Sequence, residues 1–396
     1  MFSRRIRQMT PSATSSLVGK IAELRASGAD IISFSAGEPD FPTPTKVVEA
    51  CCLALWDGKT KYEGVGGILP LRQAICEKLL EDNGLPYGPD QICVSTGAKQ
   101  ALYNAVMALC DEGDEVIIPT PCWVSYVEIV KLAGGVPVLV STNEDFSLNI
   151  GNIVAAMTDR TKLLIINTPN NPTGAVYPQE TLDALGEIVT GRDTYVISDE
   201  VYEKLVYGGK RHVSIAARSP ELYRRTVVIN GFSKAFSMTG WRIGYSAASV
   251  ELTKAMTGLQ SHVSSNSTSF VQWAAIEALN SCAGEVEAMR RAFEERRDYM
   301  WSRLSSMPGI SCLRPDGAFY LMPDVSRYIG SHSPKGEIRS SQDLCTYLLE
   351  DAKIAAVPGE AFCRPNTLRF AYSTSMENIQ TGMDRMERAL AQLRDI

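Results

Sequence analysis

The stretch GFSKAFSMTGWRIG, residues 231–244, contains a lysine in surroundings that could make it reactive. Lys234 follows the apolar run TVVIN and has Gly, Phe and Met as neighbours. Burial among such side chains lowers the pKa of a lysine and suits it to forming a Schiff base with a carbonyl compound. Arg242 lies eight residues further on and could pair with a phosphate group as a fork. The alternative is that both residues are surface charges.

A carboxylate and a phenol lie close together in SDEVY, residues 198–202, at the end of another apolar run. Asp199 could keep the nitrogen of a pyridine ring protonated, which makes such a ring an electron sink. Tyr202, three residues on, could donate a hydrogen bond to an oxygen on the same ring. The alternative for Asp199 is an N-cap of the following helix.

Two more polar segments follow apolar runs. NTPNNPTG, residues 167–174, has the Pro and Asn content of a rigid turn, and Asn171–Pro172 is a candidate for a cis peptide bond. STGAKQ, residues 95–100, would start a helix, where backbone N–H groups bind phosphate and Gly97 permits close approach. The alternatives are a plain loop and an ordinary turn between a strand and a helix.

The elements that must position these segments can be predicted from about residue 90 onward. β-branched runs occur at 91–95, 115–119, 136–140, 162–167, 194–198, 226–230 and 242–246, and they alternate with helical patterns such as 98–110, 124–132 and 181–189. This alternation predicts an α/β domain whose mostly parallel sheet is covered by helices on both faces. Since the sites of open α/β sheets lie beyond the carboxyl ends of the strands, we expect the four polar segments to meet there.

The length of 396 residues predicts two domains. After about residue 250, a charged helical stretch near 285–306 precedes short strands near 310–313, 318–322 and 367–371 and a terminal helix from about Ser375. That pattern is typical of a smaller α+β domain. We predict an N-terminal arm and part of the small domain over 1–45, a large domain over 46–284, and the C-terminal small domain over 285–396.

Composition and charge argue against several classes of protein. A net charge of -6 argues against nucleic acid or an anionic membrane as a partner, because both call for a basic face. No apolar run approaches the ~20 residues of a membrane-spanning helix. The 10 cysteines form no C-x-x-C pair and the 3 histidines are dispersed, which predicts a reducing cytoplasm, no disulfide framework and no metal site. The Arg- and Ser-rich start could be a transit peptide, but we interpret it as a surface arm.

In order and spacing, the polar segments resemble those of the class I and II aminotransferases, a family of pyridoxal 5'-phosphate enzymes. The resemblance covers nearly the whole chain. Further matching stretches are SAGEPDFPTP (35–44), KYEGVGGILPLR (61–72), PCWVSY (121–126) and LRFAYSTS (368–375). PSAT (11–14), together with Lys99, is similar to the prokaryotic-type branch of the aspartate aminotransferases.

The resemblance implies roles around the cofactor ring. Lys234 would hold the cofactor as a Schiff base and later act as general base and acid toward the substrate. Asp199 would pair with the ring nitrogen, while Tyr202 and Asn171 would hydrogen-bond the 3-oxygen. Trp123 would stack on the ring face.

The resemblance also implies a phosphate site that is shared between two subunits. Arg242 and Tyr62 would bind the phosphate, with Tyr62 reaching the site of the neighbouring subunit, so the active unit should be a homodimer. The other implied phosphate ligands are Gly97, Ala98, Lys99 and Ser233. Familiar family members carry a Ser three residues before the lysine, where this chain has Gly231, so Ser233 is an open candidate.

The substrate contacts implied by the resemblance fall into two groups. Arg369 would bind the α-carboxylate as a fork, and the residues around it would be Gly37, Trp123 and Asn171. The distal carboxylate of a dicarboxylic substrate would be read by Ser12, Thr14 and Lys99.

These expectations predict a transamination of L-aspartate with 2-oxoglutarate that yields oxaloacetate and L-glutamate. One alternative is a different substrate: an aromatic amino acid, alanine, or prephenate, which gives arogenate. Members that use prephenate carry a Lys just before PSAT, and this chain has Thr10 there. A pyridoxal-phosphate lyase and a non-catalytic binding protein on the same fold are the remaining alternatives.

Overall fold

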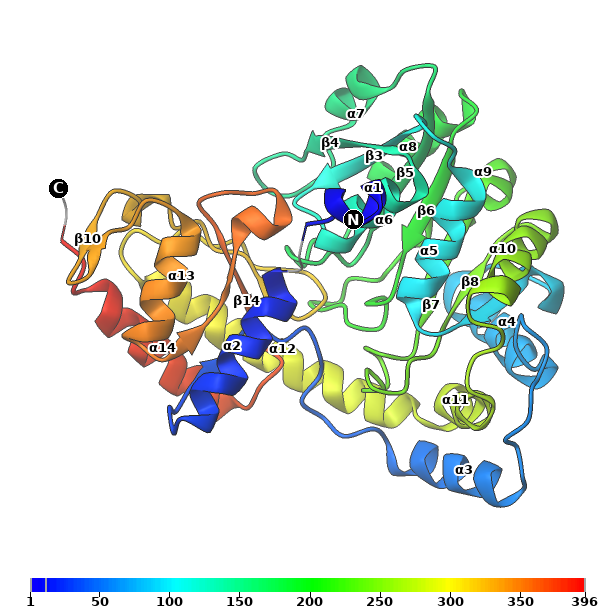
Figure 1. The fold of residues 1–396 in the computed structure, drawn as a ribbon, viewed down its shortest axis with the longest axis horizontal. Coiled ribbons are helices and arrows are strands. Elements are labelled where there is room, and N and C mark those ends of the chain that lie inside the picture. Colours follow the sequence, from blue (N-terminus) through cyan, green and yellow to red (C-terminus); the bar gives the residue numbers. More distant parts are fainter. Residues whose placement is uncertain (1, 11–12, 395–396) are drawn as a thin grey trace.

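The computed structural model describes residues 2–10 and 13–394, apart from the side chains of residues 4, 13–16 and 18. Within these residues, seven strands form one sheet in the order β2-β8-β7-β6-β5-β3-β4 (Figure 1). The strands are β2 (Ile92–Ser95), β3 (Glu115–Thr120), β4 (Val136–Ser141), β5 (Thr161–Asn167), β6 (Tyr195–Asp199), β7 (Thr226–Gly231) and β8 (Gly244–Ala247). β8 is antiparallel to both of its neighbours, and the other pairs are parallel. The predicted mostly parallel sheet is therefore confirmed.

Both faces of the sheet are buried, which explains the near-continuous apolar runs. In β5, Leu163 and Ile165 pack on one face with α5 (Ala98–Leu109), α6 (Val124–Ala133) and α10 (Val250–Val263). The alternate residues Leu164 and Ile166 pack on the other face with α7 (Ile150–Ala156), α8 (Gln179–Thr190) and α9 (Pro220–Arg225). The β2–β8 edge packs with α3 (Thr45–Trp56), α4 (Leu69–Asn83) and α11 (Ser269–Ser281).

The rest of the described chain forms a smaller part with its own core. It contains the sheet β13-β14-β9, made of β13 (Val357–Pro358), β14 (Leu368–Ala371) and β9 (Tyr320–Leu321). Its helices are α12 (Ala283–Ser306), α13 (Ser341–Glu350) and α14 (Met376–Leu390), with the hairpin β10 (His332–Ser333) and β11 (Gly336–Glu337) nearby. Figure 1 shows α12 running from α11 to α14, so it links the two parts.

The N-terminal region contributes to this smaller part. After α1 (Arg4–Gln8) and α2 (Ala13–Ala26), the strand β1 (Ile32–Ser33) pairs in parallel with β12 (Ile354–Ala355). The expected association of the N-terminal stretch with the C-terminal region is therefore present, while the boundaries at 45 and 284 stay predictions. The predicted strand at 310–313 is wrong, because only a single bridge from Ser311 to Asp324 forms before Pro315 turns the chain. No helix in the described ranges has the length and apolar character needed to cross a membrane.

Candidate active site

The polar segments meet beyond the carboxyl ends of the parallel strands, around a cavity of about 510 Å³. Loops after β3, β5, β6 and β7 contribute to it, as does the start of α5. β14 and the segment after β1 close it from the smaller part. The predicted site residues that line this cavity are Gly37, Ala98, Lys99, Trp123, Asn171, Asp199, Tyr202, Ser233, Lys234, Arg242 and Arg369.

Lys234 extends into the cavity from the turn after β7. Its ammonium donates to the carbonyl oxygen of Gly37 at 2.5 Å and lies 5.8 Å from the ring centroid of Tyr202. Burial lowers the pKa of Lys234 to about 8, and the positive charges of Arg369 and Arg242 act in the same direction. About a tenth of this amine is therefore uncharged at pH 7, far more than for an ordinary lysine, and the uncharged amine is the form that attacks a carbonyl group.

Asp199 ends β6 with a carboxylate that is only 5 % exposed. Burial raises its pKa to about 6, against the opposing effect of a hydrogen bond from the Tyr126 hydroxyl. That bond is 2.6 Å long and reaches the carboxylate oxygen Oδ2. No described residue forms an ion pair with Asp199, so this buried acid is suited to a cationic N–H group of a ligand. Tyr126 was not predicted, although its spacing from Trp123 places both on one side of α6.

Arg369, in β14, is a buried guanidinium that faces the same cavity at 3 % exposure. It donates to the side-chain oxygen of Asn171 at 3.1 Å and to the carbonyl oxygen of Ser35 at 2.8 Å. Its Nε has no hydrogen-bond partner, and no described carboxylate pairs with the group. A buried cation with only neutral partners is a strong site for an anionic ligand such as a carboxylate.

Two tyrosines connect the sides of the cavity. The hydroxyl groups of Tyr202 and Tyr320 are hydrogen-bonded to each other at 2.8 Å. The Tyr320 ring lies 4.6 Å from the Arg369 guanidinium, a distance typical of a cation–π contact. Sequence reasoning missed Tyr320, because the run GAFYL reads as a core strand. Gly37 is constrained by the same residue, since a Cβ there would lie 2.8 Å from the Tyr320 hydroxyl.

The start of α5 and Arg242 form a cationic end of the cavity. Gly97 is the N-cap of α5 with φ +81, and a Cβ there would lie 2.7 Å from Nη2 of Arg242. The first-turn N–H groups at Ala98 and Lys99 have no partners within the helix, so they are available to an anion. Ser233 lines the cavity nearby. A phosphate group fits this combination of helix dipole, guanidinium and hydroxyl.

Trp123 and Lys99 lie on the wall between the two halves of the site. Trp123 precedes α6 and packs edge-on against Tyr126, with ring centroids 5.4 Å apart. The ammonium of Lys99 lies 4.8 Å from the Trp123 ring centroid. Burial, and then the charge of Arg242, lower the pKa of Lys99. This cation is therefore placed where a second acidic group of a ligand could reach it.

Four predicted site residues are not among those that line the cavity. Gly97 lies at its edge, next to the guanidinium of Arg242. Tyr62 is 91 % exposed and lies apart from the site. Ser12 lies outside the described residues, and the side chain of Thr14 also lies outside them. The Asn171–Pro172 bond is cis, as expected, and so are Thr168–Pro169 and Thr120–Pro121.

Pyridoxal phosphate fits the residues of the cavity. The unpaired buried carboxylate of Asp199 suits the pyridine nitrogen, and the amine of Lys234 suits the aldehyde carbon. The cationic end at α5 suits the phosphate. The unpaired Arg369 then remains for a carboxylate of the substrate.

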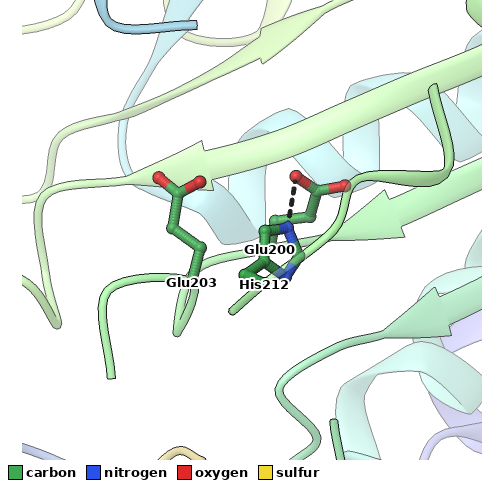
Figure 2. Close-up of side chains that lie close together, drawn as sticks. All are labelled: Glu200, Glu203 and His212. Atoms are coloured by element: carbon green, nitrogen blue, oxygen red, sulfur yellow. Dashed lines mark hydrogen bonds and ion pairs between the residues drawn. The ribbon is translucent and has the colours of Figure 1, made fainter. Parts of the chain in front are cut away.

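Glu200, Glu203 and His212 form a cluster whose possible metal-ligand atoms lie within 4.8 Å of one another (Figure 2). His212 and Glu200 are hydrogen-bonded at 3.0 Å, so this histidine is closer to acidic groups than the sequence indicated. Both carboxylates of the cluster already have protein partners, whereas Nδ1 of His212 has no hydrogen-bond partner among the described residues. Glu200 accepts from two serine hydroxyls, and Glu203 pairs with the ammonium of Lys78. Lys78 therefore supplies the positive charge that a metal would otherwise bring.

Comparisons with known proteins agree with this geometry. The family model described as aminotransferase class I and II matches residues 29–386. An aspartate aminotransferase of Geobacillus stearothermophilus is 47 % identical over 388 residues, covering 98 % of each chain. A probable aspartate/prephenate aminotransferase of Aquifex aeolicus is 46 % identical, also covering 98 % of each chain. The solved structure of Thermus thermophilus aspartate aminotransferase with maleate is similar at a TM-score of 0.92 and 42 % identity, covering 98 % of this chain and 99 % of that one.

Proposed function

Since the chain belongs to the class I and II aminotransferase family, we propose that it transfers the amino group of L-aspartate to 2-oxoglutarate, giving oxaloacetate and L-glutamate. It is an aminotransferase that uses pyridoxal 5'-phosphate. One observation carries the proposal. Within the part of the chain that the structure describes, Asp199 is a buried acid without an ion-pair partner and Arg369 is a buried guanidinium without one. Both face one cavity with Lys234.

In this proposal the protein binds the cofactor and orients the substrate so that its Cα–H bond is the one that breaks. When bound, pyridoxal phosphate supplies a conjugated ring that withdraws the electron pair left by the Cα–H bond. Asp199 holds the ring nitrogen in its protonated form, and Arg242 with the start of α5 holds the phosphate. Arg369 holds the α-carboxylate in a fixed direction. Lys234 takes the proton from Cα at its Nζ and can return it, as its pKa of about 8 allows.

Lys99 supports a dicarboxylic substrate. Its ammonium lines the cavity beside Trp123, where it can meet the distal carboxylate of aspartate. The Thermus relative is described with maleate, itself a dicarboxylate, which is consistent with such a site. Ser12 and Thr14 remain proposed partners of the same carboxylate.

Prephenate is the second candidate substrate, because some relatives are named for it. Thr10 stands where the prephenate-using members carry a Lys, and its backbone N–H donates to the Glu128 carboxylate at 3.1 Å. We therefore place aspartate first and test prephenate beside it.

The test is the absorption spectrum of the purified enzyme through both half-reactions. L-Aspartate should remove the visible band of the bound cofactor, and 2-oxoglutarate should restore it. Lys234→Ala should bind the cofactor without catalysing either change. If aspartate leaves the band unchanged but another amino acid removes it, the substrate proposal fails while the cofactor role stands. Prephenate in place of 2-oxoglutarate tests the second candidate.

We also propose a homodimer with shared sites. Tyr62 lies close in sequence to α3, which exposes Val48, Leu53, Leu55 and Trp56, the last at 82 %. Such a group of apolar side chains is typical of a protein interface. Mixing Tyr62→Ala with Lys234→Ala subunits tests it, because one site of the hybrid would contain both wild-type residues. Recovery of activity beyond that of either variant supports the shared site, and no recovery argues against it.

The proposed location is the cytoplasm. All ten cysteines are free thiols in the structure, as expected for a reducing compartment.

A further inference from the structure

Two cysteines that the catalytic site does not use lie against each other at its edge. Cys122 follows β3 and directly precedes Trp123. Cys363 ends the short helix η4 (Gly359–Phe362), between β13 and β14. The backbone N–H of Cys122 donates to the carbonyl oxygen of Phe362 at 3.2 Å, which places the two cysteines side by side, and each thiol shifts the pKa of the other. A disulfide needs Cα atoms about 5–6 Å apart, and this backbone connection is compatible with that spacing.

The two thiols differ in accessibility and in acidity. Cys363 is exposed, whereas Cys122 is 2 % exposed. The neighbouring Cys122 thiol and the charge of Lys131 outweigh burial and lower the pKa of the Cys363 thiol to about 7. The Cys363 thiol, together with burial, raises the pKa of Cys122 well above its usual range. Near neutral pH, Cys363 is thus the nucleophilic thiolate and Cys122 is the protonated thiol.

Cys363 also has a backbone conformation that is unusual for a residue with a side chain. Its φ of 61° and ψ of 31° lie in the left-handed region, at the end of a helical turn where glycine is usual. A side chain at such a position costs stability, and strained residues of this kind cluster at functional sites. The chain nevertheless places a thiol there, next to a second thiol.

We propose that Cys363 and Cys122 form a peroxide-reactive thiol pair, which closes to a disulfide between the Trp123 loop and the segment that leads to Arg369. The Cys363 thiolate attacks one oxygen of hydrogen peroxide, so that an S–O bond forms and the O–O bond breaks. The leaving hydroxide takes up from solvent the proton that the Cys363 thiol released on ionising, and departs as water. The Cys122 sulfur then attacks the oxidised sulfur of Cys363. The S–S bond forms, the S–O bond breaks, and a second water leaves with the Cys122 proton. The two thiols lose two electrons, which the peroxide gains.

The proposed disulfide would lie close to the residues of the substrate site. Phe362, the residue before Cys363, places its ring 4.8 Å from the Arg369 guanidinium. Trp123, the residue after Cys122, lines the cavity on the other side. The disulfide would therefore join the neighbour of Trp123, which lines the cavity, to the neighbour of Phe362, which contacts the cavity residue Arg369. Dithiols as reductants would reverse it.

The test treats the full-length, cofactor-loaded enzyme with hydrogen peroxide and digests it without reduction. Mass spectrometry should find the peptides of Cys122 and Cys363 joined with the loss of two hydrogen atoms, and dithiothreitol should separate them. Cys122→Ser should stop at the sulfenic acid of Cys363, which dimedone traps. Cys363→Ser should leave Cys122 reduced, and Cys363→Gly, which suits the left-handed backbone, is the second variant at that position.

Cys52→Ser is the matched control, because Cys52 is a thiol of α3 that is exposed in the single chain and lies on the helix proposed for the dimer interface. This variant should form the same joined peptides as the wild type. The proposal is overturned if Cys363 oxidises while Cys122 stays free, or if Cys52 reacts while the pair does not. The mass readout does not depend on transaminase activity, so it stands apart from the proposed substrate.

Discussion

Removal of the Tyr126 hydroxyl tests the proposed pairing of an ionised Asp199 with the cofactor. Tyr126→Phe deletes the 2.6 Å hydrogen bond to the carboxylate and little else, since the ring keeps its packing. A hydrogen bond to a charged group contributes about 1.5–3 kcal/mol. At about 1.4 kcal/mol per pH unit, its loss should raise the pKa of Asp199 by about 1–2 pH units.

The consequence for cofactor affinity depends on pH in a predictable direction. Burial already raises the pKa of Asp199 to about 6, so the apoenzyme of the wild type is mostly ionised at this position above that pH. If only the ionised form pairs with the ring nitrogen, the variant should bind pyridoxal phosphate about 10- to 100-fold more weakly near pH 5.5. Above about pH 8.5 both proteins are largely ionised at Asp199, and the difference in affinity should close.

The assay is a titration of apoenzyme with pyridoxal phosphate from pH 5.5 to 9, followed by cofactor absorbance. The ratio of the two dissociation constants cancels the titration of the cofactor's own groups. Tyr177→Phe is the control, because Tyr177 is also buried but does not contact Asp199. A ratio that stays constant across the pH range, or that never departs from one, would refute the reasoning.

Three further changes test other parts of the structure. Arg369→Lys removes the fork for the α-carboxylate, so kcat/KM for aspartate should fall about 10- to 100-fold in steady-state kinetics while cofactor affinity holds. An unchanged kcat/KM would show that Arg369 does not bind the substrate carboxylate. Gly97→Ala places a Cβ 2.7 Å from the Arg242 guanidinium, so cofactor affinity should fall at least about tenfold. Gly84→Ala, which also has positive φ but no neighbour within 4 Å, should lose only stability in a melting experiment. Lys78→Met should lower the free energy of unfolding by about 3–5 kcal/mol at pH 7. The buried carboxylate of Glu203 then loses its ion pair and, among the described residues, keeps only the hydrogen bonds from Asn83 and Asn230. Lys78 and His212 outweigh burial and lower the pKa of Glu203 to about 2, so in urea titrations the difference should shrink as the pH falls from about 4.3 toward 2.

The central sheet could be predicted because burial on both faces leaves a clear pattern. The run 162–167 is apolar at successive positions, and it became β5 (Thr161–Asn167). The run at 310–313 is similarly apolar in composition but failed as a strand. Its residue Leu313 is largely exposed, and the chain turns at Pro315 toward Gly174, whose backbone carbonyl accepts two hydrogen bonds there.

The candidate site residues that lie in a recognisable motif could be predicted from the sequence. Those whose contacts depend on the order of strands in the sheet could not. Lys234 and Asp199 lie in recognisable segments at strand ends. Tyr126 reaches Asp199 across 73 residues of sequence, because its helix α6 follows β3, and β5 alone separates β3 from β6 in the sheet. Tyr320 lies in β9, a two-residue strand that no periodicity could distinguish from core. Such partners follow from strand order, which the sequence does not display.

Asp199 and Arg369 are buried charges that have no ion-pair partner among the described residues, so a bound ligand that pairs with them should also affect the lifetime of the protein in a cell. A ligand that binds only the folded chain at 100 times its dissociation constant adds about 2.7 kcal/mol to the unfolding free energy. That gain is large against the ~5–15 kcal/mol by which proteins are stable. A shortage of the vitamin from which the cofactor is made would then remove the activity of the protein and also make the apoprotein more susceptible to proteolysis. Abundance of this protein should follow cofactor supply, a relation that pulse-chase measurement of its half-life can check.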